Sequence, residues 1–176
     1  TLLSCNAGGC TGRILYNAIT KAPDLLEVIT VPTGGTIATS YKASSAYVDV
    51  SGNLLSPHLP LFVRTVSGIT ESDPITGSTA NTTYQYAGGK YFFENLLNRR
   101  FAGFEQVTKT KPDGSKTVTY FNVADDGKIG KPIRTDLLDI SGNPIERTLT
   151  NWASGTTTSS NNGSWGMQLF TVPETA

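Results

Sequence analysis

The sequence predicts an all-β protein built from antiparallel β-hairpins and meanders, with little helix. Short runs of apolar and β-branched residues recur along the 176-residue chain, with turn residues between them. Residues 101–152 contain two such hairpins placed end to end. Charged residues make up only 16% of the chain, below the usual level of about a quarter, and Thr, Ser, Asn and Gly take their place. This composition is common among extracellular β-proteins.

The first half of the chain contains five predicted strands. They are residues 13–16, 25–31, 36–41, 61–70 and 81–86. Gly34 and Gly35 stand at the expected tip of a hairpin that joins the second and third of these strands. Residues 43–60 are predicted to form a loop. The run that begins at Leu61 is apolar on both faces, which suits a strand buried on two sides.

Residues 91–100 are the one segment in which helical spacing competes with strand patterning. Phe93, Leu96, Leu97 and Arg100 fall at positions i, i+3, i+4 and i+7. The run is short and lies between glycines and strands, and short isolated helices are only marginally stable. We therefore expect a single helical turn or a wide loop here.

The first C-terminal hairpin is predicted to span residues 104–121, with Asp113-Gly114 as a two-residue type I′ turn. That turn pairs Val107 with Tyr120, Lys109 with Val118, and Thr110 with Thr117. The second hairpin joins residues 133–140 to 145–152 through Ser141-Gly-Asn-Pro144. The residues expected to stabilise the two hairpins by packing are Val107, Val118, Tyr120, Leu137, Leu149 and Trp152. The Ser/Thr/Asn-rich tail, residues 153–176, is expected to contain one last strand.

Few residues in this sequence suit metal or cofactor chemistry. Cys5 and Cys10 flank a flexible Gly-Gly pair, so they are candidates for a small disulfide, with two free thiols as the alternative. A zinc site needs about four ligands, and these cysteines together with the single His58 do not supply them. We expect no cofactor and no metal, and we expect His58 to be a surface loop residue.

The carboxylates of the second hairpin raise the question of a glycosidase pair. Asp136, Asp139 and Glu146 lie on facing segments, but Arg134 and Arg147 lie among them, so cross-strand ion pairing explains the group more simply. Asp125-Asp126-Gly127 lacks the ligand spacing of a calcium loop and is predicted to be a turn. We therefore expect no enzymatic activity.

A cluster of aromatic residues between Tyr84 and Phe93 is open to two interpretations. It could stack a sugar on an exposed face, or it could pack in a β core, which is the more common role of such residues.

Lys and Arg together equal Asp and Glu, at 14 each, so no net charge favours nucleic acid. No apolar run approaches the roughly 20 residues of a membrane span, and we expect no direct membrane insertion. The chain starts without an initiator Met or signal peptide, and we interpret it as a piece of a larger protein.

Several segments, read in order, form one pattern of motifs. The pattern begins with Asp24-Leu-Leu26 and Gly34-Gly-Thr36, and continues through Leu59-Pro-Leu-Phe-Val63 and Tyr84-Gln-Tyr-Ala-Gly-Gly-Lys-Tyr91. Its later motifs contain Arg100, Phe101, Gly103, Phe104, Tyr120-Phe121, Gly130, Pro132, Arg134, Asp139, Gly142 and Asn143. Together these motifs extend over residues 23–152, and they resemble those of the SpvB-like and toxin-complex B (TcdB-like) proteins. The family's acidic run before the Arg-Phe pair is replaced here by the apolar Phe92-Phe-Glu-Asn-Leu-Leu-Asn98.

The resemblance implies a segment between an FG-GAP-like propeller and the Rhs/YD repeats of a secreted bacterial toxin component. Such strands form part of a larger Rhs-type β-shell that encloses a toxic polypeptide, and the segment itself carries no catalytic residue. Its implied partners are the propeller and repeats of the same polypeptide, and a pore-forming toxin subunit. The domain division expected is an N-terminal edge strand and Cys loop at 1–22, the family region at 23–152, and the tail at 153–176. The alternative function is an extracellular adhesin or carbohydrate-binding module that uses the aromatic cluster.

Overall fold

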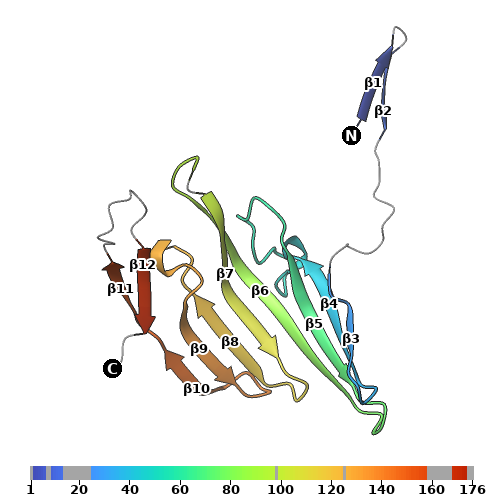
Figure 1. Ribbon diagram of the computed structural model, residues 1–176, viewed down its shortest axis with the longest axis vertical. Helices are drawn as coiled ribbons and strands as arrows, with labels where there is room; N and C mark the ends of the chain where they lie inside the picture. Colours follow the sequence, from blue (N-terminus) through green and yellow to red (C-terminus); the bar gives the residue numbers. More distant parts are fainter. Residues whose placement is uncertain are drawn as a thin grey trace.

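A computed structural model describes residues 2–6, 9–13, 25–97, 99–124, 126–157 and 168–173, with side chains described for 25–97, 99–124 and 127–153. The prediction of an antiparallel all-β fold is confirmed. Eight strands form one sheet in the order β10-β9-β8-β7-β6-β5-β4-β3, so each strand pairs with its neighbours in sequence (Figure 1). The strands are β3 (Val28–Thr30), β4 (Thr36–Ala43), β5 (Arg64–Ser72), β6 (Thr79–Phe93), β7 (Arg99–Thr110), β8 (Lys116–Phe121), β9 (Pro132–Leu138) and β10 (Pro144–Leu149).

The longest pair of strands, β6 and β7, forms the centre of the sheet. The two strands pair from Thr83 opposite Thr110 to Phe93 opposite Arg99. The expected helical turn or wide loop at 91–100 is therefore wrong, because both ends of that segment are strand and only a short connection separates them. Aromatic residues, Tyr91 to Phe93 and Phe101, flank the connection, and their preference for a pleated surface outweighs a helical spacing of one turn.

The hairpin between β7 and β8 differs from its predicted register by one residue. Val107 lies opposite Thr119, and Lys109 lies opposite Thr117. The amide of Gly114 donates to the Lys111 carbonyl and the amide of Lys111 donates to the Ser115 carbonyl, so the connection is longer than two residues. Gly114 has a positive φ of +84°, the conformation that glycine adopts at the end of a three-residue hairpin connection. A shift of one residue exchanges the two faces of a strand.

The segment between β4 and β5 fills the gap that opens where β5 and β6 stop pairing. Pairing between β5 and β6 is confined to Gly68–Ser72 and Thr79–Thr83, whereas the second half of β6 pairs only with β7. The segment contains a short 3₁₀ turn, η1 (Ser44–Ala46), and an isolated bridge between Val48 and Leu54. The Gly88 amide donates to the Leu55 carbonyl, and the Gly89 amide donates to Ser56 Oγ at 3.0 Å. The predicted loop thus supplies partners for the open edge of β6.

The expected strand at 61–70 begins later than predicted. β5 starts at Arg64, and the residues before it are not buried on two sides. Leu61 is 38% exposed and Phe62 is 78% exposed. The apolar run was correctly found, but its first residues belong to the connection that leads into the sheet.

The buried apolar residues of the described part of the chain are few. They are Tyr47, Ala102, Phe104 and Val118. Val118 was among the residues expected to pack, but Leu149 lies on the edge strand β10 and is 69% exposed, so its expected packing role is wrong. Trp152 is partly buried, and its Nε1 donates to the Pro132 carbonyl at 2.7 Å. A core normally forms between two packed layers of secondary structure. This sheet is a single layer, and this explains why its core is small.

Two further hairpins form separate two-stranded sheets. β1 (Leu2–Asn6) pairs with β2 (Gly9–Arg13), and β11 (Trp152–Thr157) pairs with β12 (Gln168–Pro173). The backbone register places Cys5 directly opposite Cys10, although the side chains of both cysteines lie outside the described ones. The expected strand at 13–16 lies almost entirely outside the described residues.

Candidate functional site: the edges and ends of the sheet

The two outer strands of the main sheet leave their edges open. β3 at one side and β10 at the other have a strand partner on one side only. Every residue of both strands is exposed, including Ile29 at 43% and Ile145 at 64%. An edge strand presents unpaired N–H and C=O groups that can pair with another strand. These edges are therefore surfaces on which a neighbouring strand could add.

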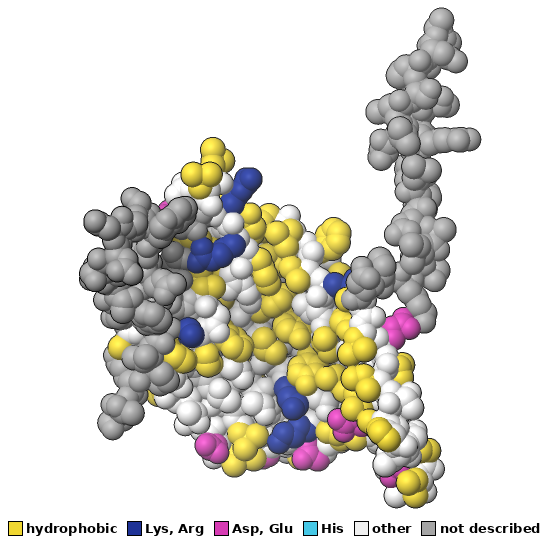
Figure 2. Space-filling view, in the orientation of Figure 1, with side chains coloured by type: hydrophobic (Ala, Val, Ile, Leu, Met, Phe, Trp, Pro, Cys, Tyr) yellow, Lys and Arg dark blue, Asp and Glu magenta, His cyan; other side chains and the backbone are white. Residues whose placement is uncertain are grey.

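Exposed apolar side chains are much more numerous than buried ones among the described residues. Figure 2 shows them as a band across the visible face of the sheet and as side chains that project at its margins. The most exposed are Val50, Phe62, Ile75, Leu96, Leu97 and Ile140. Large exposed apolar areas on a folded chain mark interaction surfaces. The arrangement fits contact with further polypeptide or another apolar surface.

A three-residue ionic cluster joins β9 to β10. Arg134 Nε donates to both Asp136 carboxylate oxygens, at 2.9 and 3.0 Å, and Arg147 Nε donates to Oδ1 at 2.7 Å. Asp136 is only 4% exposed, and its hydrogen bonds to Arg134 and then Arg147 lower its pKa from 3.8 to about 2. The Arg134 guanidinium also lies 4.3 Å from the centre of the Tyr120 ring.

The chemistry of this cluster is structural. A carboxylate that is doubly ion-paired and ionised at neutral pH is poorly suited to act as a general acid. The other two carboxylates of the predicted group lie elsewhere: Asp139 accepts hydrogen bonds from Asn143 within its own turn, and Glu146 is exposed on the edge strand. The expectation of cross-strand ion pairing is therefore confirmed only for Asp136 with Arg147, because Arg134 lies on the same strand as Asp136. It does not account for Asp139 or Glu146.

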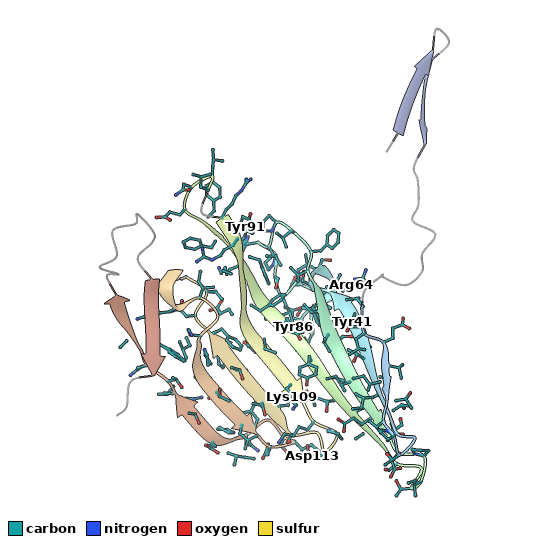
Figure 3. The ribbon with its side chains drawn as sticks, viewed as in Figure 1. Tyr41, Arg64, Tyr86, Tyr91, Lys109 and Asp113 are labelled. Carbon is teal, nitrogen blue, oxygen red and sulfur yellow. The ribbon has the colours of Figure 1, made fainter. Side chains whose placement is uncertain are left out.

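Of the aromatic cluster between Tyr84 and Phe93, Tyr86 packs against other rings at the centre of the sheet, whereas Phe93 is exposed at the end of β6. The Tyr86 ring lies 5.5 Å from the Tyr47 ring and 5.0 Å from the Phe104 ring, and Phe101 lies 5.3 Å from Phe104. Burial raises the pKa of Tyr86. Figure 3 shows Tyr86 in the middle of the sheet and Tyr91 toward one end. Sequence reasoning missed Tyr47, because it belongs to a loop that only the fold brings over β6.

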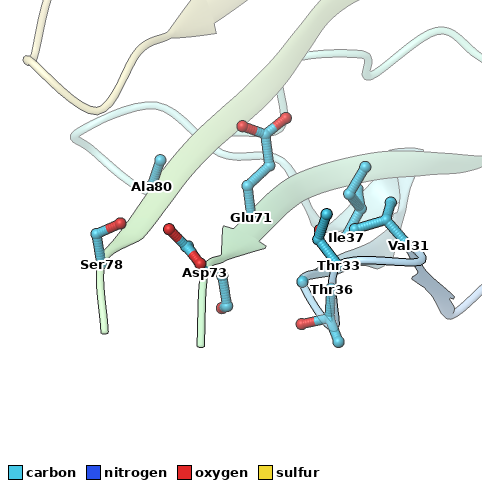
Figure 4. Close-up of a pocket in the computed structure, with 10 residues that line it drawn as sticks. Val31, Thr33, Thr36, Ile37, Glu71, Asp73, Ser78 and Ala80 are labelled. Atoms are coloured by element: carbon cyan, nitrogen blue, oxygen red, sulfur yellow. The ribbon is translucent and has the colours of Figure 1, made fainter. Parts of the chain in front are cut away.

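A cleft of about 320 Å³ lies between the turns that follow β3 and β5 (Figure 4). Glu71 and Asp73 contribute carboxylates, and Val31, Ile37 and Ala80 contribute apolar surface. Asp73 is already engaged, because its carboxylate accepts from the Ile75 amide and the Thr76 hydroxyl, and these bonds lower its pKa. The Asp73 carboxylate is therefore used to hold its own turn.

The glycines singled out by the sequence lie at turns or irregular points of strands. Gly103, Gly114, Gly130 and Gly142 have φ values between +78° and +99°. Of the other motif residues, Asp113 accepts from the Ser115 amide at 2.9 Å, and the Arg100 guanidinium lies 5.0 Å from the Phe92 ring centre. These positions shape the backbone and the surface, and they do not converge on one point.

One turn motif occurs twice, a repeat that sequence reasoning missed. Asp49-Val-Ser-Gly-Asn53 and Asp139-Ile-Ser-Gly-Asn143 make the same bonds: the Asn amide and Nδ2 both donate to the Asp carboxylate. In each copy the Asn hydrogen bonds lower the pKa of the Asp. The signal was readable, since four of the five residues are identical. Their carboxylates are used internally to hold the turn.

No group of three or more His, Cys, Asp and Glu residues suited to a metal ion occurs among the described residues. No helix in that part of the chain is long and apolar enough to cross a membrane. The exposed His58 lies in the connection before β5. The fold and its surfaces thus define a class of protein: an open, single-layer antiparallel sheet that presents edges and apolar surface.

The family model for the insecticide toxin TcdB middle/N-terminal region matches residues 11–128. Because this match covers more than half of the 176 residues, the chain belongs to that family. A comparison with curated proteins finds no match. The matched range starts earlier than the motifs at 23–152 and stops before the segment that holds Gly130, Pro132, Arg134, Gly142 and Asn143.

Proposed function

We propose that this chain is a non-catalytic structural segment of a secreted bacterial toxin-complex protein. In this role its sheet forms part of a β-shell around a toxic polypeptide, between a propeller region and Rhs/YD repeats. The observation that carries the proposal is the sheet itself: eight strands in one layer, four buried apolar residues among those described, and an open strand at each edge. Membership of the toxin family supports the same role.

The proposed partners are neighbouring parts of the same polypeptide, with a pore-forming toxin subunit as a further one. Strand addition at β3 and β10 would satisfy the open backbone groups of both edges. Exposed apolar residues on the same strands, such as Val28 and Ile145, would be covered in that arrangement. The alternative, a sugar-binding aromatic face, is less well supported, because Tyr86 is engaged with Tyr47 and Phe104.

The test begins with the coding sequence on both sides of this segment. The shell proposal predicts propeller repeats upstream and YD repeats downstream. A longer polypeptide that includes both should then be compared with the 176-residue chain by amide hydrogen exchange. We expect the amides of β3 and β10 to exchange at least about tenfold more slowly in the longer protein, because new strands pair with them.

The internal reference is β7, which already has a partner strand on each side over Gln106–Thr110. Its amides should exchange at the same rate in both proteins. Tandem adhesin modules in the flanking sequence, or edge amides that exchange equally fast in the longer protein, would contradict the shell proposal.

A further inference from the structure

One end of the main sheet carries two exposed apolar prongs. The first prong is the connection between β6 and β7, where Phe93 is 59% exposed, Leu96 is 74% exposed and Leu97 is 98% exposed. The second prong is the segment before β5, where Leu61 is 38% exposed and Phe62 is 78% exposed. We call residues 61–64, 90–97 and 99–101 together the tip end.

The fold brings the two prongs to the same end of the sheet. β5 begins at Arg64 and runs antiparallel to β6, which ends at Phe93, so these two residues lie at the same end. The segments also approach each other, since a Cβ on Gly89 would lie 2.9 Å from Leu59 Cδ2. Figure 3 shows Arg64 and Tyr91 toward this end. Strand β7 pairs with β8 only from Gln106, so the first prong extends beyond the neighbouring strand.

Charge is distributed unevenly along the sheet, although the whole chain has a net charge of zero. The tip end contains four cationic residues and one carboxylate: Arg64, Lys90, Arg99, Arg100 and Glu94. The turns at the opposite end contain Asp73, Asp113 and Asp139, together with Lys111. The tip end is therefore cationic and apolar together, and its partner should be anionic and able to take up apolar side chains.

The shape and composition of the tip end favour one class of partner. Its apolar residues project outward in two places, and they do not line a groove, which suits a soft, extended surface. Tyr91, at the base of the first prong, is of the type that gathers at the boundary between lipid and water. Arg and Lys beside buried apolar groups can keep their charges at the headgroup level. We propose that the tip end docks on an anionic lipid membrane, with its apolar prongs at headgroup depth.

This docking differs from the expectation of no membrane insertion that the sequence supports. That expectation rests on the absence of a long apolar run, and interfacial docking needs no such run. The apolar residues of the tip end belong to two segments about 30 positions apart in the chain, and only the fold brings them to the same end of the sheet. The proposal goes beyond the shell role and does not depend on it.

The test is flotation of the 176-residue chain with lipid vesicles. The chain should float with vesicles of phosphatidylcholine that contain about 30% phosphatidylserine, and much less with phosphatidylcholine alone. The double variant Leu96→Ser/Leu97→Ser should lower the apparent partition coefficient by about tenfold or more, because it removes two exposed apolar side chains. Raising NaCl from about 0.1 M to about 1 M shortens the Debye length from about 10 Å to about 3 Å and should also weaken binding.

The matched control is Ile75→Ser. Ile75 is 79% exposed, similar to Leu96, but it lies in the turn at the opposite, acidic end. This variant should bind vesicles like the wild type, and far-UV circular dichroism should show that all variants fold. The proposal is overturned if the wild type does not float with anionic vesicles, or if both variants lose binding equally. It is also overturned if the Leu96/Leu97 variant changes only self-association in the absence of lipid, which would make the tip end a protein interface.

Discussion

Replacing Phe104 with Ala should cause a large loss of stability. Phe104 is 9% exposed and is one of four buried apolar residues among those described. Its ring contacts Tyr86 and Phe101, and its Cε1 lies 3.2 Å from the position of a Cβ on Gly89. Truncation of a buried Phe to Ala costs about 3–5 kcal/mol. We expect about 3 kcal/mol, since water can enter part of the space beside a single-layer sheet.

The assay is equilibrium unfolding in urea, followed by far-UV circular dichroism and by tryptophan fluorescence. With a slope of about 2 kcal/mol per molar urea, a loss of 3 kcal/mol moves the midpoint down by about 1.5 M. The slope itself should not change, because the variant exposes nearly the same surface on unfolding. Agreement between the two probes would show that the sheet unfolds as one unit.

The matched control for this change is Phe93→Ala. Phe93 is the same residue type on the same hairpin, but it is 59% exposed at the end of β6. Its truncation should alter the free energy of unfolding by no more than about 0.5 kcal/mol. If the two variants lost equal stability, or if Phe104→Ala cost less than about 1 kcal/mol, the aromatic cluster would not be the core of this sheet.

Two further predictions concern charge and backbone. The folded-state pKa of Asp136, about 2, lies below its ordinary value of 3.8, so its ion pairs stabilise the fold above pH 4 and are lost as the pH falls toward 2. The melting temperature should fall as the pH falls from about 4 to about 2. The Asp136→Asn variant should melt at a lower temperature at neutral pH, and its melting temperature should fall less steeply with pH. An equally steep fall in the variant would contradict this explanation. Gly103 has a φ of +99° with open space around it, so Gly103→Ala should cost about 1–3 kcal/mol through backbone strain alone. A neutral result in urea unfolding would show that the backbone relaxes there.

Local patterns in the sequence were sufficient to predict most strands of the main sheet. Alternation and turn residues such as Gly34 and Gly114 place hairpins reliably, because a strand's side-chain period and a turn's φ requirements are local properties. The cross-strand ion pair of Asp136 with Arg147 was also predicted, since residues of opposite charge on facing strands of a hairpin lie close together. The repeated Asp-x-Ser-Gly-Asn turn could have been read in the same way.

Register and burial could not be read from local patterns alone. The extra residues in the turn at Asp113 shift every pair of the β7–β8 hairpin, and a pattern rich in Thr is compatible with either register. Helical spacing at Phe93 and Leu96 competed with strand preference, and only the pairing of β6 with β7 decides between them. Leu149 is apolar, but its place on an edge strand leaves it exposed.

The sequence by itself determined the fold class, the family and the positions of most turns, because these depend on residue types at short spacing. The tertiary structure alone decided which surfaces the protein offers. It brought Tyr47 against Tyr86 from a loop, and it gathered Phe62 and Leu97 at one cationic end of the sheet. Such long-range neighbours depend on which strands pair and on where the pairing of β5 with β6 ends. Strand pairing is a property of the whole sheet.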